Sequence, residues 1–303
     1  MTEITWIPEP TKQLTSQAID VDQAIVEQLP PGCKVMGAKS HGASFWTRTA
    51  RIDVQLADGT PKKYFLKVSS GELGMSMLRG EYYGVKTLHE YTPEGIPRAI
   101  AWGTYVSDPS KHFYLAEFME MIEDLPDIRK FSAMLAKLHH DSMMDPKAPT
   151  KFGYHVMTHE GSMYQDLTWS ETWEELYSRR FQSFVDQELV SQGPSEEIER
   201  LVLGLKEKVI PRLLRPLNTH GRSLKPVALH GNIWCGNMGT NAATGDPVYF
   251  DPSVFWGHNE YDVGSMATPR YKLGRQWMRE YHKFFPITEP EDDYEDRNLL
   301  YAM

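Results

Sequence analysis

The residues with the clearest chemical potential lie in two short segments, LHGNIWCGN at 229–237 and VYFD at 248–251. The first contains His230, Asn232 and Asn237, and the second ends on Asp251. Side-chain oxygens of Asn and Asp are ligands that Mg²⁺ accepts. The interval from 232 to 237 equals the interval between the catalytic base and the metal-binding Asn in kinase loops. The pattern therefore predicts a site for metal-assisted phosphoryl transfer.

Position 232 departs from the kinase pattern. The residue there is normally an Asp that accepts the proton of the attacking hydroxyl. Asn232 has nearly the same size, but its amide cannot take up a proton. General-base assistance contributes about 10²–10⁴-fold to a rate, so we expect folding and nucleotide binding to survive and transfer to be impaired. A natural pseudoenzyme, an engineered inactive variant and a slow kinase all remain open.

A lysine and a glutamate in the first third fit the same chemistry. Lys67 lies in the apolar run 65–68, where a buried ammonium needs an anionic partner. Glu81 follows in a predicted helix, and in kinases such a pair orients the α- and β-phosphates of ATP. Taken alone, a solvated edge-strand lysine and a surface glutamate are the simpler explanation. Combined with the two downstream segments, we interpret them as a phosphate-orienting pair.

Residues 37–44, GAKSHGAS, are a candidate for the turn that covers the phosphates. Gly42 permits a close approach of the backbone, and Ser44 and free N–H groups can donate to phosphate oxygens. The segment is not a GxGxxG pattern. An ordinary turn between strands explains it nearly as well.

The residue pattern changes near residue 121, from patterns typical of strands to patterns typical of helices. The elements predicted before this point are strands at 44–54 and 63–68 joined by a turn at 57–60, a helix at 75–91, and strands around 101–104 and 112–119. The elements predicted after it are helices at 128–140, 171–189 and 197–214, the last kinked or divided by Pro211, and a hairpin closed at 243–246. We therefore predict an α+β, bilobal protein-kinase-like fold. Its N-terminal lobe is an antiparallel sheet with one helix at 1–118, for nucleotide binding, and its larger helical lobe at 119–303 is for catalysis and substrate.

Composition narrows the possible partners. Lys and Arg number 32 against 41 Asp and Glu, a net charge of −9 that disfavours nucleic-acid and anionic-membrane binding. No apolar run approaches the roughly 20 residues of a membrane span, and the N-terminus lacks a signal-peptide pattern. The two cysteines, Cys33 and Cys235, cannot form a disulfide framework. We expect a cytoplasmic protein, monomeric by preference.

At this point the sequence resembles a known family, the fructosamine kinases, also called ketosamine-3-kinases or protein-ribulosamine 3-kinases. The likeness is greatest to the fungal branch, and the family belongs with the aminoglycoside phosphotransferases and choline kinases. The resembling segments are KFGYHV at 151–156, TWSETW at 168–173, LHGNIWCGN at 229–237, FDPSVFWGHNEYD at 250–262 and PRYKLG at 269–274. The resemblance runs from about Gly37 to the end, although family members continue for several helices further.

The resemblance implies a role for particular residues. It implies ATP and Mg²⁺ as cofactors, with Asn232 at the position of the general base beside His230. The nucleotide-binding residues would be Gly42, Ser44, Lys67, Glu81 and the hinge Glu117, Phe118 and Met119. The metal ligands would be Asn237 and Asp251, and the sugar pocket would be lined by His155, Trp169 and Trp173. A tryptophan pair four apart on a helix is equally often core packing.

The implied reaction is phosphorylation of the 3-hydroxyl of a ketosamine, a sugar attached to an amine or a protein lysine. The product would shed the sugar, so the expected effect is deglycation. One alternative is a pseudokinase that binds nucleotide or glycated ligand without turnover, for which Asn232 is the motivation. A second is a kinase of another small hydroxyl metabolite, choline-like or aminoglycoside-like.

Overall fold

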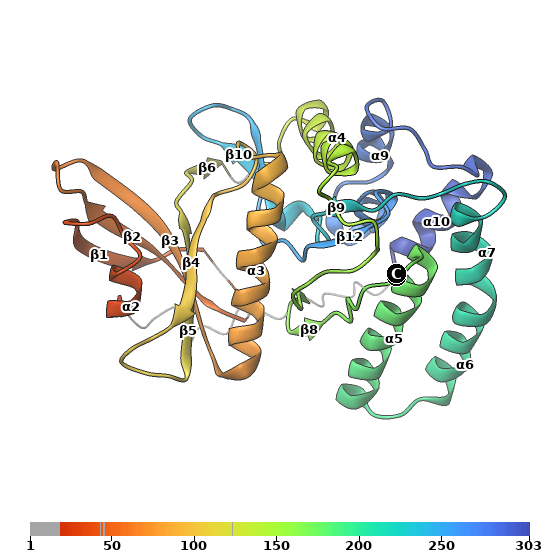
Figure 1. Ribbon diagram of the computed structural model, residues 1–303, viewed down its shortest axis with the longest axis horizontal. Helices are drawn as coiled ribbons and strands as arrows, with labels where there is room; N and C mark the ends of the chain where they lie inside the picture. The colour runs from red at the N-terminus through yellow and green to blue at the C-terminus, as the bar shows by residue number, and fades with distance from the viewer. Residues whose placement is uncertain (1–18, 43, 45, 123) are drawn as a thin grey trace, which may run out of the picture. The chain divides into compact units, whose positions relative to one another are not determined.

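The computed structural model describes residues 19–42, 44, 46–122 and 124–303 (Figure 1). These residues form two compact units. Unit 1 holds the described residues up to Tyr82 together with Arg98–Met119, and unit 2 holds Tyr83–Pro97 and the described residues from Glu120 on. The roles expected for residues 1–118 and 119–303 stay predictions.

Unit 1 is built on a five-stranded antiparallel sheet in the order β1-β2-β3-β5-β4. Its strands are β1 (Lys34–Ser40), β2 (Arg48–Gln55), β3 (Pro61–Ser70), β4 (Ala99–Thr104) and β5 (Lys111–Glu117). The predicted hairpin of β2 and β3 is confirmed, and its turn is closed by the Leu56 N–H, which donates to Thr60 O at 2.8 Å. Strand β1 was not predicted as such, because Gly37 and the polar residues after it resemble a loop.

One face of this sheet carries the apolar core of unit 1. Alternate residues of β2 and β3, among them Ile52, Val54 and Leu66, are buried with Ile25 of the short helix α2 (Gln23–Val26), which lies against the sheet (Figure 1). Because side chains alternate along a strand, the residues between them occupy the opposite face. Lys67 is on that opposite face, and so are its neighbours two positions away.

Helix α3 (Gly71–Tyr91) begins four residues before the predicted start at 75. Gly71 and Gly74 resemble helix breakers in the sequence, but a Cβ at Gly74 would lie 2.5 Å from Ser69 Oγ. The absence of a side chain there lets the first turn pack on the end of β3. The helix contributes residues to unit 1 up to Tyr82 and to unit 2 from Tyr83.

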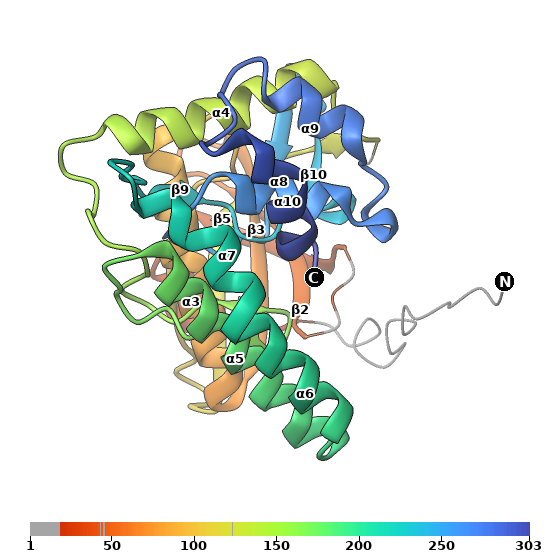
Figure 2. The same ribbon diagram turned by 90° about the vertical axis from the view of Figure 1, so that its right-hand side faces the viewer.

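Unit 2 is mainly helical, as predicted. Its helices are α4 (Ile128–Met144), α5 (Trp173–Gln192), α6 (Glu196–Gly204), α7 (Ile210–Leu214), α8 (Glu260–Gly264), α9 (Arg275–Tyr281) and α10 (Tyr294–Tyr301). Helix α5 begins with a capping box, in which Thr172 and Glu175 satisfy each other's backbone N–H groups. The predicted helix at 197–214 is divided: a π-helical turn (Leu205–Val209) separates α6 from α7, where Pro211 stands in the first turn. Helices α5 and α7 lie side by side (Figure 2).

Short strands hold the loops of unit 2. Strands β6 (Met121–Ile122), β10 (Met238–Asn241) and β11 (Pro247–Tyr249) form one sheet, and the predicted hairpin closed at 243–246 joins β10 to β11. Strand β9 (Val227–Leu229) pairs with β12 (Phe255–Gly257), and β7 (His159–Glu160) with β8 (Met163–Tyr164). Among the described residues, no helix combines the length and the apolar character needed to cross a bilayer.

A buried polar network supports the interior of unit 2. Arg297 and Glu260 are both 0% exposed and form a two-pronged ion pair, with N–O distances of 2.7 and 3.0 Å. His258, also fully buried, contacts the Tyr301 hydroxyl and Thr288 Oγ1, each at 2.9 Å. The network joins the chain after β12 to helix α10, so α10 is an integral part of this core.

The burial of His258 makes the stability of the chain depend on pH. Burial lowers the pKa of His258 to about 4, against a usual value near 6.5. The unfolded chain therefore takes up a proton first, and stability that is complete above about pH 6.5 is lost as the pH falls toward 4. We expect the free energy of unfolding in urea to fall by about 2 kcal/mol between pH 7 and pH 5 from this residue. A His258→Gln variant should show a smaller decrease, and an equal decrease in both proteins would contradict the assignment.

Candidate active site

The segment 230–237 is anchored through its backbone to a buried carboxylate. The N–H groups of His230 and Gly231 donate to the two carboxylate oxygens of Asp262, each at 2.8 Å. Asp262 is 1% exposed, and the Nε2 of the buried His139 lies 3.2 Å from one of its oxygens. This carboxylate fixes the start of the loop that carries Asn232.

His230 is a positioning residue by its contacts. Its ring is completely buried, the Nε2–H donates to Phe250 O at 3.1 Å, and Nδ1 accepts from the N–H of Asn232 at 3.3 Å. Burial lowers the pKa of His230 to about 4, so the ring is neutral at pH 7. Both ring nitrogens therefore have partners within the loop and its surroundings, and the contacts favour a positioning role for His230 over the catalytic role predicted for it.

Gly231 allows the loop to reach the backbone after Asp251. Its φ is +78°, and a Cβ there would lie 2.3 Å from Ser253 O. The Ser253 N–H donates to His230 O at 2.9 Å. Any side chain at position 231 would force the segments 230–232 and 251–253 apart.

The residue at the predicted base position and the two predicted metal ligands meet at one backbone carbonyl. The Nδ2 groups of Asn232 and Asn237 both donate to Asp251 O, each at 3.4 Å, and Asn237 Nδ2 also donates to Asn232 O at 3.0 Å. Asp251 has a φ of +53°, in the left-handed region. The Asn237 N–H also donates to Trp234 O, and the Asn237 carbonyl accepts from the Phe250 N–H. Unit 2 therefore brings together the sequence-predicted residues 230, 232, 237 and 251.

The chemistry of Asn237 and Asp251 suits a hard cation. The Asn237 amide donates these two hydrogen bonds through its Nδ2, and its Oδ1 is the atom that could bind a cation. An amide oxygen and a carboxylate are the oxygen ligands that Mg²⁺ takes, usually in addition to water and substrate phosphates. Among the described residues, no group of three or more His, Cys, Asp or Glu has a metal-binding arrangement. The donor set thus fits Mg²⁺ held partly by a phosphate ligand better than an all-protein metal cage.

Unit 1 brings Lys67 and Glu81 together. Lys67 Nζ lies 2.8 and 2.9 Å from the two carboxylate oxygens of Glu81. Their side chains are 7% and 14% exposed, so the ammonium is largely removed from water and paired. This is the strand–helix ion pair that the sequence predicted.

The predicted phosphate-covering segment is shorter than expected. Residues 37–40 belong to β1, so the turn itself begins at His41, whose N–H donates to Thr49 O at 3.1 Å. Gly42 has a φ of +75°. Ser44 Oγ accepts from the N–H groups of Trp46 and Thr47 and from Thr47 Oγ1. Those bonds tie Ser44 to the residues just before β2.

The predicted hinge Glu117–Met119 begins at the last residue of β5. The Glu117 N–H already donates to Arg98 O at 2.9 Å, and its carboxylate pairs with Arg98 at 3.1 Å and Lys62 at 3.6 Å. Phe118 follows, with the His41 ring 4.8 Å from its own. Glu117 thus fastens the end of the sheet, and the role of residues 117–119 as a hinge for the nucleotide stays a prediction.

Two of the three predicted substrate residues are accessible. His155 is exposed, with its ring 4.5 Å from that of Tyr154 and 5.6 Å from that of Tyr83. Trp169 is 38% exposed and lies in the extended segment before α5, where a Cβ at Gly153 would lie 3.0 Å from its Cα. Both residues can contact a ligand without a change in the core.

Trp173 does not share this environment. It is the first residue of α5 and 0% exposed, and its Nε1–H donates to the Tyr301 hydroxyl at 2.8 Å. Its ring also packs on Phe255 and Tyr177. The expectation of a tryptophan pair on one helix is wrong, because Trp169 precedes the helix, and the structure favours core packing for Trp173.

Sequence reasoning gave no role to Asp262 and His139, which anchor the loop at 230–231. An acidic residue among the apolar residues of a short helix is the signal that could have indicated Asp262, since a buried carboxylate needs several donors. His41, beside Phe118, also had no assigned role.

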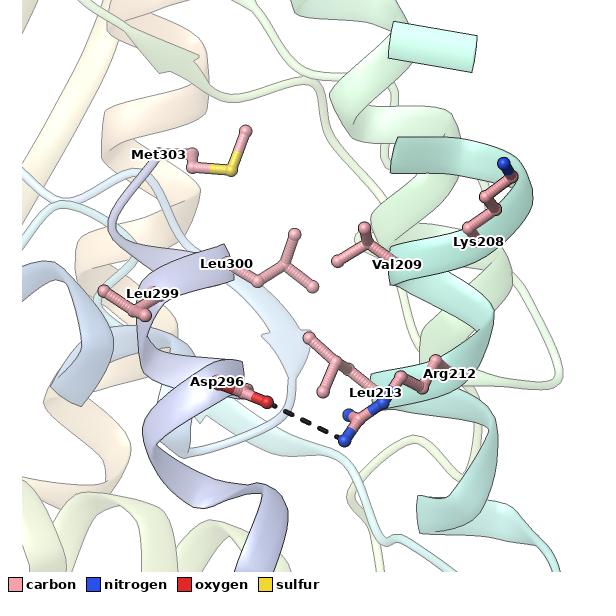
Figure 3. A pocket seen from close by; sticks show the side chains of 8 residues that line it. All are labelled: Lys208, Val209, Arg212, Leu213, Asp296, Leu299, Leu300 and Met303. Carbon is pink, nitrogen blue, oxygen red and sulfur yellow. Dashed lines mark ion pairs between the residues drawn. The ribbon is translucent and has the colours of Figure 1, made fainter. Parts of the chain in front are cut away.

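A cavity of about 400 Å³ lies elsewhere in unit 2. It is formed by α10 and the segment from the π-helical turn into α7, with Val209, Leu213 and Leu300 pointing into it (Figure 3). An ion pair of Arg212 and Asp296, at 3.7 Å, stands at one side. Its lining contains none of the predicted catalytic, metal or substrate residues.

The family model and the curated relatives indicate the same family. Residues 40–303 match the family model described as fructosamine kinase. The chain is 32% identical to mouse ketosamine-3-kinase over 288 residues, covering 88% of this chain and 84% of the mouse protein. It is 27% identical to a chloroplastic protein-ribulosamine 3-kinase of Oryza sativa subsp. japonica, covering 79% of this chain and 65% of the rice protein.

The fold is similar to that of a solved structure. A crystal structure of a protein from Thermobifida fusca YX-ER1, provisionally named a fructosamine-3-kinase, superposes with a TM-score of 0.70 at 20% identity. The superposition covers 93% of this chain and 90% of that one. The predicted kinase-like α+β fold is confirmed.

Proposed function

This chain belongs to the fructosamine kinase family, and from that premise we propose that it transfers the γ-phosphate of ATP to a ketosamine, slowly because of Asn232. The observation that carries the proposal is the cluster of Asn232, Asn237 and Asp251 around one carbonyl. The cluster supports the proposal because Asn232 would face the acceptor hydroxyl, next to an amide and a carboxylate that would bind Mg²⁺.

In the proposed reaction each residue has a separate task. Lys67, fixed by Glu81, would hold the phosphates of ATP. Asn237 and Asp251 would hold Mg²⁺, which neutralises phosphate charge when it is bound. Asn232 can orient the attacking hydroxyl through a hydrogen bond but cannot remove its proton. The proton must therefore leave to a phosphate oxygen or to water, which is the reason for slow turnover.

The acceptor we propose is the 3-hydroxyl of a fructosamine or ribulosamine, free or on a protein lysine, so that the result is deglycation. The names of the mouse and rice relatives support this choice. The test is transfer of labelled phosphate from ATP to a fructosamine and to a ribulosamine, with choline and an aminoglycoside as other acceptors. Transfer only to the latter pair would contradict the ketosamine assignment.

A second candidate is binding without turnover, which Asn232 specifically favours. If the chain binds nucleotide, a nucleotide concentration of about 100 times the Kd should raise its free energy of unfolding by about 2.7 kcal/mol. A thermal shift with Mg-ATP and no transfer to any acceptor would support this alternative. The absence of a shift with any nucleotide would contradict both candidates.

We further propose that the chain acts in the cytoplasm as a monomer. Cys33 and Cys235 are both free thiols in the structure, which suits a reducing compartment. Size-exclusion chromatography with light scattering checks the monomer, and a mass twice that of the 34.8 kDa chain would contradict it.

Trp169 should matter for the substrate and not for folding. We expect Trp169→Ala to raise KM for a ketosamine about tenfold with little change in kcat, because a sugar loses an aromatic face against which its C–H groups pack. Trp169 is 38% exposed, so the melting temperature should change little. Phe284→Ala, which removes an aromatic ring that is 42% exposed, is the matched control and should leave KM unchanged. Equal KM values for all three proteins would contradict the assignment of Trp169 to the substrate site.

A further inference from the structure

His41, an aromatic residue that directly follows β1, lies on the face of the unit 1 sheet that carries Lys67. His41 continues β1 opposite Thr49, and Thr49 pairs in register with Lys67 of β3. The neighbouring row pairs Arg51 with Phe65. Because side chains alternate, His41, Phe65 and Lys67 share the face opposite the apolar core.

On this face three aromatic rings meet. The His41 ring lies edge-on to Phe118, with centroids 4.8 Å apart and planes at 66°. It also meets Phe65 at 6.4 Å and 83°. Phe65 and Phe118 are half-buried, whereas His41 is exposed. His41 is therefore the solvent-side member of the trio, and the one whose side chain can move without disturbing the core.

Positive charges surround the trio. Lys67 Nζ lies 6.0 Å from the centre of the Phe65 ring. Arg51, which also pairs with Asp53 at 2.9 Å, and Lys63 each lie 5.8 Å from the centre of the Phe118 ring. Flat aromatic surfaces beside cations suit a ligand that combines a planar base with phosphates.

We propose that His41, with Phe65 and Phe118, forms the wall against which the purine base of the nucleotide packs, His41 turning from its edge-on contact to stack on the base. The inference rests on the proposed use of ATP and adds a residue that determines base affinity. Lys67 lies two residues after Phe65 on the same face of the sheet. It would hold the phosphates of the same ligand. His41 therefore acts on the base and Lys67 on the phosphates.

The test separates the base from the phosphates. Calorimetric titrations of the full chain with Mg-ATP, Mg-ADP and inorganic tripolyphosphate compare the unaltered protein with His41→Ala and His41→Phe. His41→Ala should weaken ATP and ADP about tenfold, equivalent to about 1.4 kcal/mol, and leave tripolyphosphate unchanged. His41→Phe should restore most of the loss. His140→Ala, which removes a 62% exposed histidine from α4, is the control and should change nothing.

Each other outcome is decisive. Unchanged ATP affinity in His41→Ala, in a protein that binds ATP, overturns the inference and leaves the proposed function standing. Equal weakening of ATP and tripolyphosphate assigns His41 to the phosphates and also overturns it. An unaltered chain that binds none of the three ligands overturns the proposed function and this inference together.

Discussion

The Asn232→Asp protein should transfer phosphate from ATP to a fructosamine about 10²–10⁴ times faster than the unaltered chain, the range that general-base assistance supplies. The carboxylate would accept the hydroxyl proton at the position where the amide cannot. The surroundings of position 232 are already ordered for such a carboxylate. The loop backbone is fixed on Asp262, and both ring nitrogens of the neutral His230 have hydrogen-bond partners. Steady-state kcat with saturating Mg-ATP is the measurement.

Two controls make this result specific. Asn232→Ala should be no faster than the unaltered chain, because it supplies no proton acceptor. Asn232→Asp combined with Asn237→Ala should lose the gain, because one proposed metal ligand is removed. If the Asp and Ala variants at position 232 have equal kcat values, proton transfer at this position does not limit the reaction.

The second large effect concerns stability. Arg297→Met should lower the free energy of unfolding by about 3–5 kcal/mol, the cost of leaving one member of a buried ion pair without its partner. The guanidinium also donates to Thr288 O at 2.7 Å and Pro290 O at 2.8 Å. Burial acts to raise the pKa of Glu260, but His258 and Arg297 outweigh it and hold that pKa below its usual value. Without Arg297 the Glu260 carboxylate remains charged or must take up a proton at a cost.

A surface pair in the same unit provides the matched control. Arg275 and Glu295 are 3.2 Å apart, with side chains 71% and 63% exposed. Arg275→Met should change the free energy of unfolding by less than about 1 kcal/mol. Urea denaturation at pH 7 measures both variants. Similar small losses for the two would show that the Glu260–Arg297 pair contributes no more than a solvated one.

The parts of the molecule that local pattern specifies were predictable. The alternation of β2 and β3 around a Gly-containing turn indicated a hairpin, and helical spacing placed Glu81 on the element after Lys67. The interval from 232 to 237 indicated the loop in which those residues meet Asp251. In each case the signal is the periodicity or the spacing of residues within neighbouring elements.

The parts that depend on distant contacts were not predictable. Trp173 has the same chemistry as Trp169, and its burial is decided by Tyr301 and Phe255 from other elements. Asp262 holds a loop some thirty positions earlier in the sequence. Strand β1 was hidden because Gly37 resembles a loop, although the pairing with β2 determines its conformation. Local periodicity carries no information about such partners.

The amide at position 232 is well matched to its immediate scaffold. It donates a long hydrogen bond to Asp251 O, a carbonyl that Asn237 also approaches as a donor. An acid in its place would direct a negatively charged oxygen at that carbonyl, an arrangement that repels unless a divalent ion intervenes. Under the proposed function, an acid at position 232 would supply a proton acceptor but lose this hydrogen bond, whereas the amide keeps the bond and supplies no acceptor.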